Sequence, residues 1–329
     1  MISLIAVLLG GAVYAQDIDT SSHSIQFVTV DKDVKLEVLD WGGSGRPLVL
    51  LAGLGNNAHI FDSFAPALTP SYHVYGITRR GFGASSVPTS GYSSDRLGDD
   101  VLAVLDALKL NRPVLTGHSV AGEELSSIGS RHPERVAGLI YLEAGYGYAF
   151  YDSAHGDLNI DLFDLLNKLP QVLTARDARQ LIDELLTTAL PRFEGDLRER
   201  QKDLSATPPQ PPQPRTAAAT SPPPAPPFRP NYAVITGQQK YTDIRVPVLA
   251  IYASPHNPSP PVSNDSAVLA AFEARDKTRV DAIAKAFEIG VPSARVVRLP
   301  HADHFVFLSN QADVLREMNA FIASLPAPQ

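Results

Sequence analysis

The sequence predicts an α/β protein built on a doubly wound, mostly parallel sheet, with a helical lid inserted late in the order of strands. From Ile25 onward, short apolar runs of strand length alternate with helix-length amphipathic stretches. The strand-length runs are apolar almost throughout, as expected for strands that are buried on both faces of a parallel sheet.

Composition narrows the class of protein further. The chain has 329 residues, 44% of them hydrophobic and 19% charged, so it can bury one large core or two small ones. Its 28 Lys and Arg against 35 Asp and Glu give a net charge of −7, which argues against nucleic acid or an anionic membrane surface as a partner. The absence of cysteine excludes disulfides, thiolate metal sites and a cysteine nucleophile.

The first residues are typical of an export signal. Met1 to Val13 is an uncharged apolar run, followed by small Ala15 and then polar Gln16. The run is shorter than the roughly 18 to 20 residues that a membrane-spanning helix needs. We therefore expect a signal peptide over 1–15, a secreted or periplasmic protein, and no stable membrane anchor. The alternatives are an anchor or a buried first segment.

The predicted elements follow in order from residue 34. Residues 34–38 alternate apolar and charged side chains, as in an exposed strand, and Gly42 to Gly45 then predict a turn. Helices are predicted between the later strands, the second with Leu97, Val101, Leu105 and Leu108 on one stripe. The predicted buried strands are 47–51, 74–77, 114–116, 138–142 and 248–252, and the helices are 57–68, 94–108 and 122–130.

The alternation stops after Gly145. Helices are predicted at 158–169 and 175–190, and residues 208–230 hold 11 prolines in 23 positions, which indicates a polyproline-type or mobile loop. The strand pattern resumes at Val246. We therefore predict a core of residues 16–145 and 243–329, interrupted by a helical lid over 146–242. The last predicted elements are a helix at 267–289, a strand at 294–299 and a helix at 311–324.

A serine stands where a strand passes into a helix. Residues 112–122 run from an apolar strand through Gly117 and His118 to Ser119, with small Ala121 and Gly122 following. A serine on such a sharp turn is lifted out of the backbone at the carboxyl end of the sheet, where its hydroxyl can act as a nucleophile. The alternative is a serine that merely caps a helix.

These features resemble the α/β-hydrolases that carry an inserted lid, over about residues 25–324. Ala52-Gly53-Leu54-Gly55 follows the strand 47–51, where the family places its oxyanion loop, so the resemblance implies that the backbone N–H groups of Leu54 and Val120 form the oxyanion hole. Arg80 to Ser85 resembles the family's Arg-Gly-x-Gly-x-Ser turn, with Thr78 at a position where an aspartate is common.

A serine hydroxyl needs a general base at neutral pH. The family places this histidine between the last strand and the last helix, and His304 lies there, directly before Phe305-Val306-Phe307. The resemblance therefore implies His304 as the base, and His301 as a structural residue. A metal at the His301/His304 pair is not expected, because no third ligand lies nearby in the sequence.

The carboxylate that orients the base has two possible positions in the sequence. The loop after strand 248–252, where most relatives carry it, reads Ala-Ser-Pro-His-Asn-Pro and has no acid. Some families, haloalkane dehalogenases among them, take the acid from the end of the preceding strand, and Glu143 stands there. Glu143 is our first choice and Asp265 the alternative, since a triad is defined by geometry rather than by sequence position.

The resemblance implies a carboxylesterase-like serine hydrolase that acts on a small or medium acyl substrate through an acyl-enzyme, with neither a metal nor an organic cofactor. A catalytically silent protein that binds a hydrophobic ligand is the alternative, as are peptidase, cofactor-free peroxidase and lyase activities on the same fold. A small molecule is the only partner expected, and the sequence carries no signature of an oligomeric state.

Three further patterns have competing interpretations. Gly53 to Ala58 formally matches a dinucleotide-binding fingerprint, with Arg79 and Arg80 as a phosphate clamp, but this leaves the serine turn unexplained. The aromatic residues of 146–151 are equally suited to an acyl pocket and to hinge packing. The charged stretch 273–277 predicts a solvated helix face.

Overall fold

The computed structural model describes residues 23–205, 228–257 and 265–327. The predicted signal peptide and residues 208–227 of the proline-rich segment lie outside this part. Within it, no helix combines the length and the apolar character needed to cross a bilayer.

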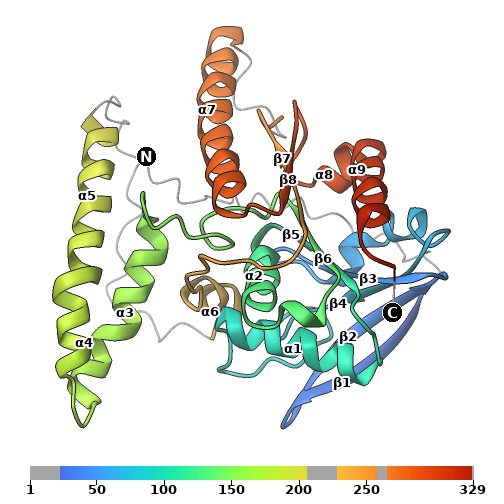
Figure 1. Cartoon of the computed structure of the whole chain (residues 1–329), viewed down its shortest axis with the longest axis horizontal. Coiled ribbons are helices and arrows are strands. Elements are labelled where there is room, and N and C mark those ends of the chain that lie inside the picture. Colours follow the sequence, from blue (N-terminus) through green and yellow to red (C-terminus); the bar gives the residue numbers. More distant parts are fainter. Residues whose placement is uncertain (1–22, 206–227, 258–264, 328–329) are drawn as a thin grey trace, which may run out of the picture. The chain divides into compact units, whose positions relative to one another are not determined.

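One mostly parallel sheet runs through the core, as predicted, and it has eight strands (Figure 1). The strand order is β1-β2-β4-β3-β5-β6-β7-β8. The first two strands pair antiparallel, β2 is also antiparallel to β4, and every later pairing is parallel. The strands are β1 Ser24–Asp31, β2 Val34–Gly42, β3 Arg46–Leu51, β4 Tyr72–Ile77, β5 Val114–His118, β6 Gly138–Leu142, β7 Val248–Ala253 and β8 Ala294–Leu299.

Strand β2 is not the exposed strand that its alternating sequence predicts. It lies between β1 and β4, and Leu36, Glu37 and Val38 are all buried. The Glu37 carboxylate accepts a 2.7 Å hydrogen bond from the Thr78 hydroxyl, which compensates for its burial. The charged residue that suggested solvent therefore belongs to a buried polar contact.

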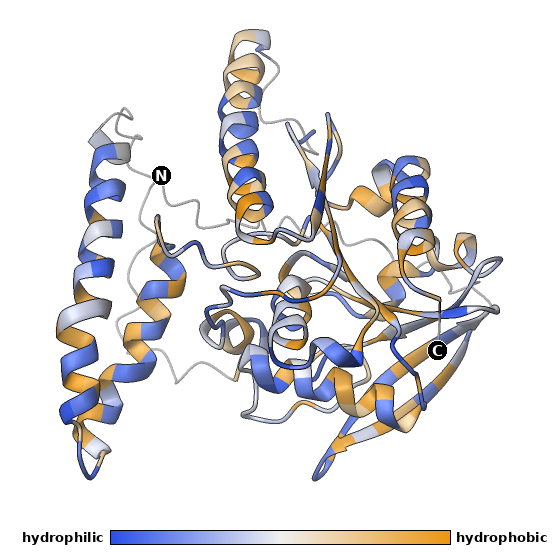
Figure 2. Ribbon diagram, viewed as in Figure 1, coloured by the Kyte–Doolittle hydropathy of each residue, from blue (hydrophilic) through white to orange (hydrophobic). Residues whose placement is uncertain are grey.

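Helices cover both faces of the sheet. Helices α1 (Ser94–Ala107), α2 (Gly122–Arg131) and α7 (Ser266–Gly290) pack in one apolar cluster on one face. The short helix α8 (Val306–Ser309) and helix α9 (Gln311–Ser324) pack in the other cluster. Their apolar sides are visible as orange stripes in Figure 2. In α1 the predicted stripe is borne out, because Leu97, Val101 and Leu105 are all buried.

The helix predicted over 57–68 is replaced by two short 3₁₀ turns, η1 (Ala58–Phe61) and η2 (Ala65–Ala67). Asn57 caps the first turn, and Pro66, which lacks an N–H, lies in the second. Phe61 and Phe64 are fully buried. The proline thus interrupts the predicted helix, while the apolar side chains of the segment still pack against the sheet.

The described residues between 153 and 229 form a compact unit of their own, separate from the unit that contains the sheet. Its helices are α3 (Leu158–Thr174), α4 (Arg179–Glu184) and α5 (Leu190–Ser205), with a π-helical turn at Leu185–Ala189. Leu165, Leu185 and Ala189 form its small core. The chain re-enters the sheet-bearing unit at helix α6 (Pro230–Thr236), and β7 then pairs with β6. The segment therefore interrupts a single sheet.

Candidate active site

The residues singled out in the sequence converge at one edge of the sheet. Strands β3, β5, β6, β7 and β8 are parallel neighbours, so their carboxyl ends lie side by side. Gly53, Ser119, Glu143 and His304 follow the ends of β3, β5, β6 and β8. In open α/β sheets this edge is where ligands bind.

Ser119 occupies a strained turn between β5 and α2. Its φ angle is +53°, a left-handed conformation that is uncommon for a residue with a side chain. Small residues make room for it. A Cβ on Gly122 would lie 2.1 Å from the Ala144 carbonyl oxygen, and one on Gly117 would lie 3.1 Å from the Ala121 Cβ. The turn thus has the close backbone packing that the glycine and alanine positions predict.

His304 is within hydrogen-bond distance of this serine. Its Nε2 lies 3.0 Å from the Ser119 Oγ, and its Nδ1 lies 3.1 Å from Oε2 of Glu143. A carboxylate only accepts, so Nδ1 carries the proton and Nε2 is left to accept from the hydroxyl. The three residues have the geometry of a nucleophile, a base and an orienting acid.

Glu143 is fully buried, and both of its oxygens are hydrogen-bonded. Oε1 accepts from the backbone N–H of Ala253 at 2.6 Å, and Oε2 accepts from the Tyr146 hydroxyl at 2.8 Å as well as from His304. Burial raises the pKa of this carboxyl, but hydrogen bonds from His256 and His304 outweigh burial and lower the pKa to about 2. Glu143 is therefore an anion at neutral pH.

His256 is a member of the site that sequence reasoning missed. Its Nε2 lies 2.7 Å from Oε2 of Glu143, and its Nδ1 lies 2.8 Å from Oδ2 of Asp276 in α7. Burial lowers the pKa of His256, but the hydrogen bonds to Asp276 and Glu143 outweigh burial and raise the pKa to about 10. His256 is therefore a cation that donates to both carboxylates.

Asp276 also corrects a prediction. Ala274, Arg275 and Lys277 are exposed, as predicted for a solvated face over 273–277, but the Asp276 side chain is buried and paired with His256. The position of His256 in the sequence could have indicated this role, because His256 lies in the loop after β7, where most α/β-hydrolases carry the orienting acid. At this position the chain carries a histidine that holds the acid of the neighbouring strand.

A second histidine, His118, holds the loop that carries the base His304. It is buried next to Ser119, and its Nε2 lies 3.0 Å from the backbone oxygen of His304. Burial lowers its pKa to about 3, so His118 is neutral and donates this hydrogen bond through Nε2–H. Its ring also packs against Phe305 and Phe307. The loop that carries His304 is thereby attached to the serine turn.

The predicted oxyanion loop lies directly against the nucleophile. A Cβ on Gly53 would stand 3.1 Å from the Ser119 Cβ. The side chains of Leu54 and Val120 belong to the same small apolar cluster, so the two predicted N–H donors come from adjoining segments. Arg79 supports the loop by donating to the carbonyl of Ala52 at 3.0 Å.

The structure bears on two alternatives from the sequence: Asp265 as the orienting acid, and Arg79 with Arg80 as a phosphate clamp. The Asp265 carboxylate caps α7 by accepting from Ala267 N at 2.8 Å, so Glu143 is the acid that the structure brings to His304. Arg79 and Arg80 are buried in bidentate ion pairs with acidic partners, so they are not available as a phosphate clamp, which agrees with setting the dinucleotide interpretation aside. Their partners are Glu124 and Asp100.

The aromatic residues after β6 serve the core and the site together. Tyr146, Tyr148 and Phe150 pack against the main apolar cluster. In addition, Tyr146 donates a hydrogen bond to Glu143. Hinge packing and contact with the catalytic groups are therefore combined in one short segment.

Comparison with known proteins places the chain in a family. The family model described as the alpha/beta hydrolase fold matches residues 46–311, more than half of the chain, and the protein belongs to this family. 3-oxoadipate enol-lactonase 2 of Acinetobacter baylyi is 32% identical over 110 residues, 33% of this chain and 41% of the lactonase. The AB hydrolase superfamily protein YisY of Bacillus subtilis is 33% identical over 148 residues, 42% of this chain and 54% of that protein.

These curated relatives are thus matched over about half of their length or less. Among solved structures, the esterase RhEst1 from Rhodococcus sp. ECU1013 is similar with a TM-score of 0.55 and 18% identity, covering 92% of this chain and all of the esterase. At this identity the likeness concerns the fold.

Proposed function

We propose that the protein is a serine hydrolase that cleaves a small or medium ester-like substrate through an acyl-enzyme. The observation that carries the proposal is the continuous chain of contacts from Ser119 Oγ to His304 to the Glu143 carboxylate. A positioned base activates a serine hydroxyl, and a buried anion stabilises the imidazolium that forms as the proton is taken up.

In the proposed reaction, Ser119 Oγ attacks the substrate carbonyl carbon while its proton passes to His304 Nε2. The carbonyl oxygen becomes an oxyanion, which the N–H groups of Leu54 and Val120 stabilise. His304 then gives the proton to the leaving alcohol, and the ester C–O bond breaks. Water repeats the sequence on the acyl-enzyme, with His304 as base, and releases the acid.

The ester preference rests on two lines of support. The matched relatives include a protein named as an enol-lactonase and a structure named as an esterase, and both names denote the opening of an ester-type bond. The catalytic residues proposed here need neither a metal nor an organic cofactor. We also propose that the helical insertion acts as a lid that selects the substrate, and that the mature protein is exported.

The test is hydrolysis of p-nitrophenyl esters, from acetate to decanoate, by the mature protein and by Ser119→Ala. Removal of the nucleophile should lower kcat by about 10⁶-fold, as in serine proteases. A fluorophosphonate should label the parent protein at Ser119 and leave the variant unlabelled. Labelling without turnover would retain the nucleophile and reject these substrates, whereas absence of both would favour the silent ligand-binding protein.

A further inference from the structure

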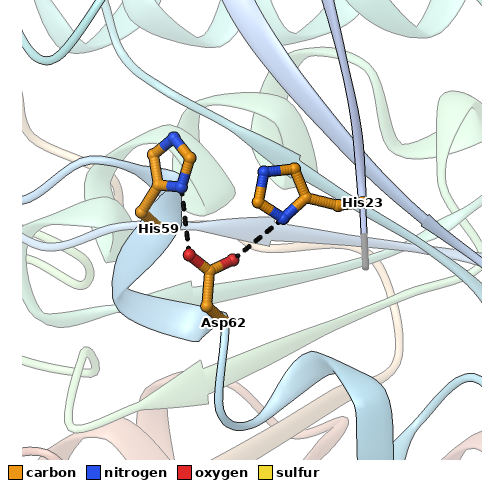
Figure 3. A group of neighbouring side chains, drawn as sticks. All are labelled: His23, His59 and Asp62. Carbon is orange, nitrogen blue, oxygen red and sulfur yellow. Dashed lines mark hydrogen bonds and ion pairs between the residues drawn. The ribbon is translucent and has the colours of Figure 1, made fainter. Parts of the chain in front are cut away.

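A second group of chemically active side chains lies near the start of β1, outside the proposed catalytic site. His23 directly precedes β1, His59 lies in η1, and Asp62 follows η1. Both imidazoles face the same carboxylate: His23 Nδ1 is 3.4 Å from Asp62 Oδ1, and His59 Nδ1 is 3.0 Å from Asp62 Oδ2 (Figure 3).

The ligand atoms of these three residues lie within 4.8 Å of one another. Zn²⁺ binds imidazole nitrogen and carboxylate oxygen at about 2.0–2.2 Å, so two ligands of a tetrahedral ion are roughly 3.3–3.5 Å apart. The contact between His23 Nδ1 and Asp62 Oδ1 already has this separation. The third ligand atom, on His59, lies within 4.8 Å of the other two, and coordination would require it to move inward.

Two neighbouring side chains contact the cluster in the way that outer partners contact the ligands of a metal site. The Trp41 indole N–H donates to Asp62 Oδ1 at 3.2 Å and holds the carboxylate. On the far side of the His59 ring, Nε2 lies 3.6 Å from a Glu37 carboxylate oxygen. Metal-binding histidines commonly direct their second ring nitrogen at a carboxylate, which fixes the ring and raises its basicity as a ligand.

One side of the cluster is buried and the other faces solvent. The His23 side chain is 3% exposed, while the side chains of His59 and Asp62 are 29% and 20% exposed. An ion held by these three groups would keep one coordination position open to solvent, where a water molecule can bind. Two imidazoles with one carboxylate favour Zn²⁺ and similar transition ions over Mg²⁺ or Ca²⁺, which prefer oxygen ligands.

We propose that His23, His59 and Asp62 bind one divalent transition-metal ion, with Zn²⁺ the first choice. The ion would connect the start of the edge strand β1 to the segment between β3 and β4, two parts of the chain that are distant in sequence. None of its ligands belongs to the proposed catalytic residues, so the effect that we expect to measure is on stability. Metal binding should therefore stabilise the fold.

The experiment uses tag-free, chelator-treated protein titrated with Zn²⁺ against a chromophoric competitor, with metal content measured after desalting. We expect one equivalent in the parent protein. His59→Gln and Asp62→Asn should each weaken binding by more than the roughly 10- to 100-fold that loss of an outer partner of a metal site costs. Zn²⁺ should also raise the Tm of the parent protein and leave that of both variants unchanged.

The matched control is His256→Gln, because Glu143, His256 and His304 are the other group of potential ligands in the described part of the chain. Retention of one equivalent in this control supports the proposal. Loss of Zn²⁺ only in this control would move the ion to the catalytic residues and overturn the proposal. Absence of saturable binding, or equal binding by the parent and both site variants, would leave the cluster as a hydrogen-bonded network alone.

Discussion

The Nε2 of His256 lies 2.7 Å from Oε2 of Glu143. The cationic imidazole of His256, in the loop after β7, therefore donates a hydrogen bond to the buried carboxylate of Glu143 at the end of β6. The same carboxylate oxygen receives His304, and Asp276 receives the other nitrogen of His256. The site is therefore a row of four alternating acids and bases, from Asp276 through His256 and Glu143 to His304. The hydrogen bonds along this row keep Glu143 ionised and His256 protonated.

The first prediction concerns the acid. Glu143→Gln should lower kcat by about 10⁴-fold, the loss found when the carboxylate of such a triad becomes an amide, because an amide no longer stabilises the imidazolium or fixes its tautomer. Ester hydrolysis under saturating substrate measures this. Asp265→Asn is the matched control and should retain activity, since its side chain caps α7. A Glu143→Gln enzyme close to parental activity would remove Glu143 from the mechanism.

The second prediction assigns His256 a positioning role. A hydrogen bond to a charged group is worth about 1.5–3 kcal/mol, so His256→Gln should lower kcat/KM by roughly 10- to 100-fold. Loss of the nearby cation also leaves the Glu143 charge less compensated. Protonation of the catalytic base then becomes easier, and the acidic limb of the kcat/KM profile should move to higher pH.

His301→Gln is the control for this profile, because His301 is exposed and makes its hydrogen bond to Pro255 through the backbone. A purely structural role for His256 would lower the amount of folded enzyme and leave the acidic limb in place. An unshifted profile would thus contradict the positioning role, even if the overall activity fell.

The third prediction concerns stability and pH. The pKa of His256 is raised from 6.5 to about 10 by folding, so its contribution to the free energy of unfolding is fully present below pH 6.5 and declines as pH rises toward 10. The stability advantage of the parent protein over His256→Gln should therefore shrink over this range. Urea unfolding at pH 6, 8 and 10 measures it. A constant or growing advantage would show that His256 is not held as a cation.

Much of the fold could be predicted because the patterns that specify it lie within short stretches of the sequence. The apolar runs of β3, β5, β6 and β7 are buried on both faces, and this burial is what makes them continuous in sequence. Ser119 was recognisable from Gly117 and Ala121, which permit its left-handed backbone. His304 and Glu143 were found because the family fixes their places at the ends of particular strands.

The remaining features depend on contacts that are distant in sequence. Glu37 looked solvent-facing because its partner, Thr78, belongs to another strand. Asp276 looked like part of a charged helix face because His256 lies 20 residues before it and reaches it only in the fold. The predicted helix 57–68, in contrast, failed for a reason within its own sequence: Pro66 has no backbone N–H to donate, and its ring disfavours a continuous helix through this segment.

The last prediction tests how closely the oxyanion loop packs against the catalytic groups. A Cβ at Gly53 would lie 2.9 Å from His118 Nδ1 and 3.1 Å from the Ser119 Cβ, closer than side chains normally approach. The His118 ring cannot move freely, because it is buried and bonded to the His304 backbone. Gly53→Ala should therefore displace both the nucleophile and the base.

A displacement of about 1 Å at reacting atoms can cost about 100-fold in rate, and we expect a loss of this size in kcat/KM for Gly53→Ala. Gly195→Ala is the matched control. Among the described residues outside its own helix turn, nothing lies within 4 Å of a Cβ at Gly195 in helix α5, so activity should persist and the helix should gain about 0.5–1 kcal/mol. Kinetics and thermal melts of both variants separate the two effects. Full activity in Gly53→Ala would show that the loop yields without disturbing Ser119, whereas a rate loss with an unchanged Tm would locate the damage in the catalytic geometry.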